Sequence, residues 1–198
     1  VSWYLAVDGI SLPMLLLTNL IGFAAVFASW NVKDRAKELM ILLLLLITGV
    51  MGTFISQNLF IFLLFSEVVV IPIYIMVVIW GSSKRVTKEY AGMKLTIYLL
   101  IGSAFLLVGV MAIFTKAMDI TGVPVMNFED LAQVAFPEQF QIYMFALLLI
   151  GFGSLLSMWP LHSWSPDGYA GATTAVSMIH AGVLKKIGGY GIIRFAIF

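Results

Sequence analysis

One apolar run, from Leu39 to Trp80, most constrains the fold, because almost no polar residue interrupts it. A helix crosses the hydrocarbon core of a bilayer with about 20 residues, so this run is too long for a single crossing. Its one polar interruption is the Ser-Gln-Asn segment at 56–58. We therefore predict two antiparallel spans, at 39–56 and 59–80, joined by a tight turn.

The remaining apolar stretches complete a predicted all-α, polytopic membrane helix bundle of about six spans. With 62% hydrophobic and 11% charged residues, the chain has too little polar surface to cover a soluble globule. One helix should break near Trp159-Pro160, since proline removes a backbone donor and the polar residues 162–168 cannot face lipid. The other predicted spans lie at 10–30, 91–115, 140–159 with the break extending to 169, and 172–198.

Composition and charge exclude several classes of site. The chain has no cysteine, so disulfides and thiolate metal sites are excluded, and two histidines are too few for a dedicated transition-metal cage. A net charge of +1, with the basic residues in short loops, gives no concentrated basic face for nucleic acid.

Loop charges predict the orientation. The loops at 31–38 and 81–90 are rich in Lys and Arg, whereas the long connection at 116–139 is mostly acidic. Because basic loops stay on the cytoplasmic side, the N-terminus should lie outside. The chain starts at Val1 and ends at Phe198 inside an apolar run, so we expect a single membrane domain, 1–198, that is the N-terminal part of a longer subunit.

Glu67 is the single ionisable residue inside the predicted span 59–80. A charged side chain at a membrane helix centre costs about 2.5 to 3.5 kcal/mol on insertion scales, so an acid there is a functional hypothesis by default. We predict a proton-binding site with a partner elsewhere in the bundle. The alternative is a protonated carboxyl that is hydrogen-bonded to a neighbouring helix.

Two adjacent lysines, Lys185 and Lys186, lie in the last predicted span. Lys186 comes about 14 residues, or roughly 21 Å, into that span, which places its charge deep in the membrane. Neighbouring side chains leave a helix about 100° apart, so both cannot face one narrow cavity. A buried lysine can pick up and release a proton, whereas a snorkelling lysine only reaches the interface, an alternative that stays open above all for Lys185.

Other titratable residues have two readings each. His180 is either a proton relay or a hydrogen-bonded core histidine. Lys94, near the start of its span, is either a proton carrier or a lysine that snorkels to the surface. His162 and Asp167 flank the predicted break, where they either join a polar chain or order the loop.

Four ordered segments resemble the antiporter-like subunits of respiratory complex I, and among them the chain M family of NADH-quinone oxidoreductase. These are DGISLP at 8–13, SEVVVIPIY at 66–74, PLHSWSPD at 160–167 and AGVLKKIGGYG at 181–191. The pairing of Glu67 with Pro72-Ile73-Tyr74 favours chain M over chain L and the Mrp-type sodium/proton antiporter subunits, which share the fold.

The resemblance implies two inverted five-helix repeats, each with a broken helix, and a central chain of protonatable residues. This chain would hold the first repeat and a preceding helix. By motif, Glu67 would be the acid of the first half-channel, Lys186 the lysine of the helix after the break, and Lys94 a further basic position. The predicted proton-translocating set is therefore Glu67, Lys186, Lys94, Lys185, His180 and His162, with no catalytic, cofactor-binding or metal-binding residue.

The function implied is that of a proton-translocating membrane subunit of a complex I-type NADH:quinone oxidoreductase, which couples quinone reduction to proton pumping. Such a chain carries no redox centre; NADH, FMN, iron-sulfur clusters and quinone are expected in partner subunits. The expected partners are other membrane subunits, protons and the lipid bilayer. The expected location is the cell inner membrane, a prokaryotic plasma membrane, with several crossings.

One position departs from the family pattern. The family places a lysine in the broken helix, five residues before the proline that corresponds to Pro160, and here that residue is Leu155. Ser154 and Ser157 could hold waters there, and Lys186 or Lys185 could replace the missing lysine as the partner of Glu67. Two alternatives stay open: a Mrp-type cation/proton antiporter subunit, and a structural relative that does not pump.

Overall fold

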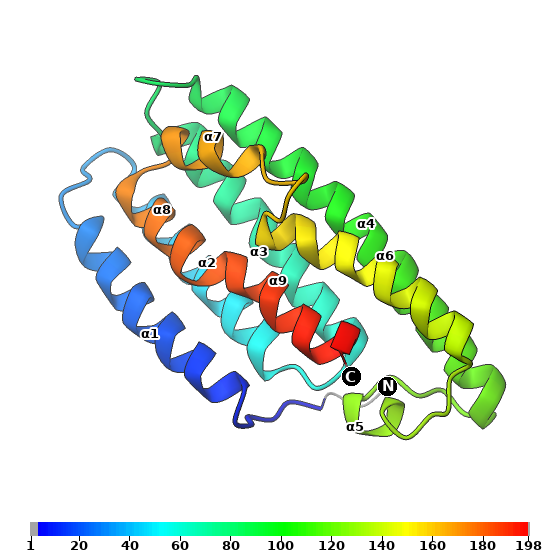
Figure 1. The fold of residues 1–198 in the computed structure, drawn as a ribbon. Helices are drawn as coiled ribbons and strands as arrows, with labels where there is room; N and C mark the ends of the chain where they lie inside the picture. Colours follow the sequence, from blue (N-terminus) through cyan, green and yellow to red (C-terminus); the bar gives the residue numbers. More distant parts are fainter. Residues whose placement is uncertain (1–3, 198) are drawn as a thin grey trace.

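The structure is a computed structural model that describes residues 4–197. Five long helices lie side by side in one bundle (Figure 1), and each is long and apolar enough to cross a membrane. A one-turn helix, α5 (Phe128–Leu131), lies at the end of the bundle that holds both chain termini. The long helices are α1 (Ser11–Ala28), α2 (Ala36–Ile55), α3 (Leu59–Trp80), α4 (Lys88–Thr121) and α6 (Glu138–Leu156).

The last part of the chain is a continuous helical stretch with two π-helical segments (Figure 1). It packs against α1 through its first half and against α6 through its second half. The predicted all-α bundle with about six spans is confirmed. In order, the segments are α8 (Thr174–Ile179), η1 (His180–Leu184), α9 (Lys185–Gly191) and η2 (Ile192–Ile197).

The predicted helix break is confirmed, although it begins before Trp159. Helix α6 ends at Leu156, Ser157 takes a left-handed conformation with φ 60°, and the chain turns. Most of the polar stretch after the turn is helical, forming α7 (Trp164–Gly171). The Trp164 indole N–H donates to the carbonyl of Ser154 over 3.1 Å, which ties α7 to the end of α6.

Helix α4 is longer than the predicted span at both ends. Its 34 residues correspond to about 51 Å, more than the roughly 30 Å of a bilayer's hydrocarbon core. The helix stops at Gly122, whose φ of 73° is the left-handed conformation that glycine adopts without strain. The apolar run predicted only the part that lies within lipid, because its polar ends can continue a helix in water.

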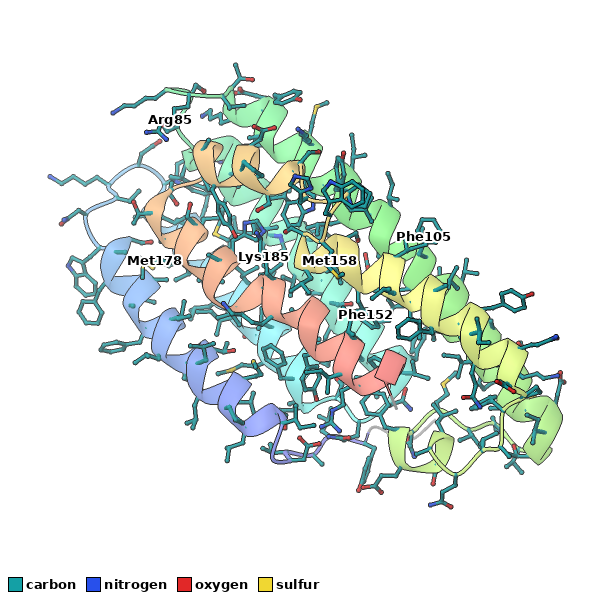
Figure 2. The ribbon with its side chains drawn as sticks, viewed as in Figure 1. Arg85, Phe105, Phe152, Met158, Met178 and Lys185 are labelled. Carbon is teal, nitrogen blue, oxygen red and sulfur yellow. The ribbon has the colours of Figure 1, made fainter. Side chains whose placement is uncertain are left out.

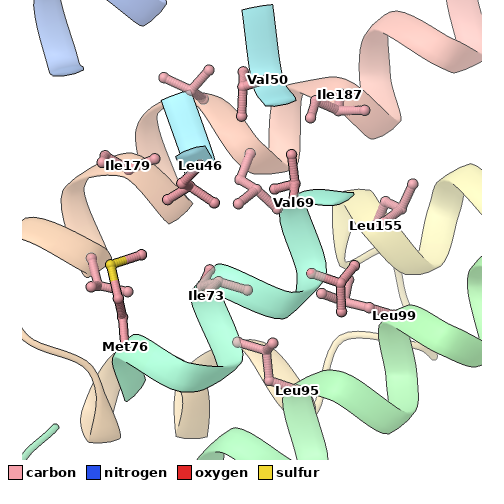
Figure 3. Packing of buried hydrophobic residues seen from close by; sticks show 14 of the residues in the cluster. Leu46, Val50, Val69, Ile73, Met76, Leu95, Leu99, Leu155, Ile179 and Ile187 are labelled. Atoms are coloured by element: carbon pink, nitrogen blue, oxygen red, sulfur yellow. The ribbon is translucent and has the colours of Figure 1, made fainter. Parts of the chain in front are cut away.

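Buried aliphatic side chains from several helices fill the centre of the bundle (Figure 3). Helices α4 and α6 approach closely where Gly102 meets Ser154 and where Gly151 meets Leu106, so there is no room for a Cβ atom at either glycine. Glycine at these two positions therefore allows α4 and α6 to pack closely. Close contacts between helix backbones let van der Waals forces hold membrane helices together.

The end of the bundle near both termini is joined by backbone hydrogen bonds. The Ala6 N–H donates to the carbonyl of Ile55 over 3.0 Å, and the Leu59 N–H donates to that of Met126 over 3.0 Å. The Asn58 side chain accepts from the Phe60 N–H over 3.0 Å, which caps the start of α3. The predicted turn between α2 and α3 is thus covered by two other segments of the chain.

Candidate functional site

Glu67 lies in the middle of α3, where its side chain is partly buried. Helix α4 packs against α3, and its buried residue Ser103 lies beside the Glu67 carboxyl. None of the three ion pairs found within residues 4–197 includes Glu67. The carboxyl therefore sits among helices with a hydroxyl neighbour and no directly bonded cation, an arrangement that suits a group which binds and releases a proton.

Lys94 and Asp167 form an ion pair between α4 and α7. The Lys94 Nζ donates to Asp167 Oδ2 over 2.6 Å, and the side chains are 21% and 27% exposed. About one turn further along α4, the Tyr98 hydroxyl accepts from Ser163 Oγ over 2.9 Å. Lys94 is thus engaged with the segment after the break, and these two contacts attach α7 to α4.

The ion pair gives a first testable prediction. Asp167→Asn should lower the free energy of unfolding by about 1 kcal/mol or less, because a partly exposed ion pair contributes little after solvent screening. Thermal unfolding of the purified protein in detergent, followed by tryptophan fluorescence, measures the change. The Lys94→Asp/Asp167→Lys double variant should be more stable than Lys94→Asp alone or Asp167→Lys alone. A double variant less stable than both of these single variants would contradict an interaction between the two side chains.

Lys185 points toward α7 and is enclosed by it. Its ammonium donates to the Ser165 hydroxyl and lies 4.7 Å from the centre of the Tyr169 ring and 5.8 Å from that of Trp164. Figure 2 shows Lys185 near the centre of the bundle. His180 contacts the same two rings, at centroid distances of 4.9 Å and 5.0 Å, and is 1% exposed. Two titratable groups therefore share one aromatic-walled site.

The other two predicted site residues lie apart from this site. The Lys186 ammonium turns back along its own helix and donates to the carbonyl of Ala181 over 2.7 Å, in an exposed hydrogen bond. His162 lies on the turn between α6 and α7, and its side chain is exposed. The six predicted residues are thus divided among Glu67, the Lys94 ion pair, the His180 and Lys185 site, and these two outlying positions.

Leu155 occupies a buried apolar position at the end of α6. It is 6% exposed and belongs to the same hydrophobic cluster as Leu99 and Ile187 (Figure 3). The neighbouring Ser154 hydroxyl donates to the carbonyl of Gly151 over 2.8 Å, within its own helix. The position where the family pattern has a lysine is therefore part of the core.

A further polar contact was missed by the sequence reasoning. Arg194 on η2 forms an ion pair with Asp8, and its Nε donates to the Tyr190 hydroxyl over 3.1 Å. Tyr190 in turn donates to the carbonyl of Phe54 over 3.2 Å. The sequence did contain an indication of this ion pair, because Arg194 and Asp8 are opposite charges at the outer ends of the last and first predicted spans.

Comparison with known proteins places this geometry in a family. Residues 56–198 match the family model described as NADH:quinone oxidoreductase/Mrp antiporter, TM. The relative named NAD(P)H-quinone oxidoreductase chain 4 3, from Picosynechococcus sp., is 40% identical over 195 residues, which cover 98% of this chain and 34% of the relative. The chain spans about a third of the length of the curated relatives it matches.

Two solved structures have a similar fold. A chain of respiratory complex I from Thermus thermophilus, with bound NADH, matches with a TM-score of 0.84 and 26% identity over 98% of this chain and 39% of that chain. A chain of the Mrp complex from Dietzia sp. matches with a TM-score of 0.73 and 27% identity over 93% of this chain and 33% of that chain. With more than half of its length matched by the family model, this chain belongs to the NADH:quinone oxidoreductase/Mrp antiporter transmembrane family.

Proposed function

We propose that this chain is the first-repeat part of a proton-translocating membrane subunit in a complex I-type NADH:quinone oxidoreductase. The observation that supports this proposal most directly is the position of the Glu67 carboxyl, which lies inside the bundle on α3 beside Ser103 of α4. An acid inside a membrane helix bundle is costly to keep charged, and such residues commonly mark proton relays. The relative that is named a chain of NAD(P)H-quinone oxidoreductase supports the assignment of the parent complex.

In this proposal the chain moves protons and does no redox chemistry itself. Hydride transfer from NADH and electron transfer through FMN, iron-sulfur clusters and quinone belong to partner subunits. Its own residues bind a proton at Glu67, hold it out of contact with bulk water, and pass it to a neighbouring group. Exposed apolar side chains of α1, such as Leu16, Leu20 and Phe23 at 64% to 68% exposure, and five helices long and apolar enough to cross a membrane support a membrane location with several crossings.

Glu67→Gln tests the proposal in the full-length protein within its complex. Removing a positioned proton-transfer group typically slows the transfer by about 100-fold or more, so the ratio of protons translocated to electrons transferred should fall. Membrane vesicles given the electron donor and quinone allow both rates to be measured together. Assembly should be retained, since glutamine keeps the size and polarity of the side chain.

Glu89→Gln is the matched control. Glu89 is an exposed acid in the first turn of α4, near a helix end that extends beyond the lipid core. The same change of charge there should leave the proton-to-electron ratio as it is in the unaltered protein. The proposal is wrong if Glu67→Gln leaves this ratio unchanged in an assembled, electron-transferring complex.

A second candidate function is a subunit of a Mrp-type cation/proton antiporter. The match to a chain of the Mrp complex from Dietzia sp., at a TM-score of 0.73, supports this alternative. Proton exchange driven by a sodium gradient, in membranes where the protein supports no quinone reduction, would identify it. Quinone-linked proton translocation without sodium dependence would identify the first candidate.

A further inference from the structure

A cavity of about 310 Å³ lies at the end of the bundle near both termini, enclosed by parts of α3, α4, α5, α6 and η2. Its walls are mostly aromatic and aliphatic, and its polar lining residues in the described part of the chain are Gln141 and Arg194. Ligand sites in proteins are mostly apolar cavities of about 300 to 1,000 Å³ with a few polar groups, so this cavity has the composition of a binding site. The aromatic lining residues are Phe128, Phe136, Phe140, Phe145 and Phe195.

The cavity crosses the boundary between the polar end of the bundle and its apolar spans. Its lining residues on α6 run from Phe140 to Leu148, about 12 Å along the helix axis. Tyr143, between them, is 69% exposed, and tyrosine on the outer surface of a membrane helix is typical of the head-group level of a bilayer. Phe145 lines the cavity and is also exposed. The cavity therefore adjoins the outer apolar surface of α6, where lipid chains lie.

Arg194 has hydrogen-bonding capacity that its contacts within the chain do not use. Its Nε donates to the Tyr190 hydroxyl and its Nη2 pairs with Asp8, whereas its Nη1 makes no hydrogen bond to the residues that the structure describes. A guanidinium has five N–H donors and no acceptor, so a molecule that bonds to Arg194 must supply an acceptor oxygen. A phospholipid supplies both an apolar chain for the aromatic walls and phosphate oxygens for the guanidinium.

Exposed acids beside the cavity indicate which head group fits. Glu129 on α5 and Glu138 at the start of α6 are exposed, and each lies one or two residues from a phenylalanine that lines the cavity. Neither belongs to an ion pair within residues 4–197. Two carboxylates repel a head group with a net negative charge and attract an ammonium group. The local charge therefore favours a zwitterionic lipid over an anionic one.

We propose that this cavity binds a phospholipid whose head group ends in a primary ammonium, of the phosphatidylethanolamine type. One acyl chain lies among the phenylalanine rings, and a phosphate oxygen accepts a hydrogen bond from Arg194. The ammonium lies beside Glu129 and Glu138. This site is separate from Glu67 and goes beyond the proposed function, so either claim can fail without the other.

Photolabelling of the full-length protein in its complex tests the proposal. The complex is placed in phosphatidylcholine vesicles with a trace of phosphatidylethanolamine that carries a photoactivatable acyl chain. Label should appear on Leu148, which lines the cavity and is 1% exposed, as well as on the outer surface at Tyr143. An excess of unlabelled phosphatidylethanolamine should remove the label from Leu148, whereas the same excess of anionic phosphatidylglycerol should not. Absence of label from Leu148, because another part of the subunit fills the cavity, or equal competition by the two lipids would overturn the proposal.

Ala132→Trp should close the cavity. Ala132 lines it at the end of α5, so a tryptophan there occupies the space of the lipid chain. Labelling of Leu148 should fall about tenfold, which corresponds to about 1.4 kcal/mol of lost affinity. Ala135→Trp makes the same change outside this cavity and should leave the labelling as it is in the unaltered protein. Equal labelling of the two variants would contradict the site, and the lipid competition decides the matter in the unaltered protein if Ala132→Trp does not assemble.

A second pair of variants tests the head group. Glu129→Gln/Glu138→Gln removes the two carboxylates beside the cavity, so phosphatidylglycerol should then compete as well as phosphatidylethanolamine does. Glu38→Gln/Glu89→Gln makes the same change of charge at the opposite end of the bundle and should keep the preference for phosphatidylethanolamine. An unchanged preference in the first double variant would overturn the assignment of an ammonium head group.

Discussion

Gly188→Ala is expected to destabilise the protein by about 3 kcal/mol, the upper part of the range for overpacked sites. A Cβ atom at Gly188 would lie 2.6 Å from the Phe152 carbonyl oxygen and 2.7 Å from the Leu156 backbone nitrogen. Both atoms belong to the backbone of α6, which cannot move aside as a side chain does. The two helices would have to separate, and the packing that holds the end of α6 would be lost.

Gly189→Ala is the matched control, because it makes the same change at the next residue. A Cβ atom there would lie 3.7 Å from the Leu156 side chain, an ordinary contact. Alanine also favours helix over glycine by about 1 kcal/mol, so this variant should be as stable as the unaltered protein or more stable. Thermal unfolding in detergent and the amount of protein in the membrane measure both variants. Equal stability of the two would contradict the close approach of α9 and α6.

Leu155→Lys is expected to cost about 3 kcal/mol or more, because an unpaired charge is costly to bury. The leucine is 6% exposed in an apolar cluster, and none of the described ion pairs lies at this position. Leu155→Met changes the same side chain without adding charge, and should cost less than about 1.5 kcal/mol. The difference in melting temperature between the two variants isolates the effect of the charge.

The same variant also tests the alternative that this chain is a relative that does not pump. If Leu155→Lys raised the proton-to-electron ratio of the complex, the apolar residue would mark a lost function. We expect no rise, because position 155 is enclosed by apolar side chains of the core. A variant as stable as Leu155→Met would show that water or a carboxylate reaches this position.

The sequence predicted the fold better than it predicted the site. Helix α3 matches its predicted bounds, because Asn58 caps its start and a glycine follows Trp80. Where a capping residue and a glycine mark the two ends of an apolar run, as in α3, the run predicts the helix bounds. Glu67 was found in the same way, as an acid in an apolar span.

The parts that were missed depend on distant contacts or on hydrogen-bond register. Tyr98 and Ser163 are 65 residues apart in the chain, and nothing local predicts that their hydroxyls meet. The π-helical turn η1 changes the directions in which the side chains of Lys185 and Lys186 leave the helix. Apolar periodicity does not reveal whether a backbone N–H bonds to the carbonyl four or five residues back. The different hydrogen-bond acceptors of these two adjacent lysines therefore became visible only in the structure.

The two ends of the bundle are held in different ways, and this makes them unequal in stiffness. Near the termini, segments from three parts of the chain are joined by main-chain hydrogen bonds that form a closed layer over the α2–α3 turn. At the opposite end, one main-chain hydrogen bond, from the Ser82 N–H to the carbonyl of Gly171, joins α7 to the loop before α4. The other described hydrogen bonds of α7 to the bundle are made by side chains: an ion pair, two hydroxyls, an indole and the Lys185 ammonium. Side-chain contacts can be exchanged one at a time, so α7 is tied to the bundle less firmly than the segments that cover the α2–α3 turn.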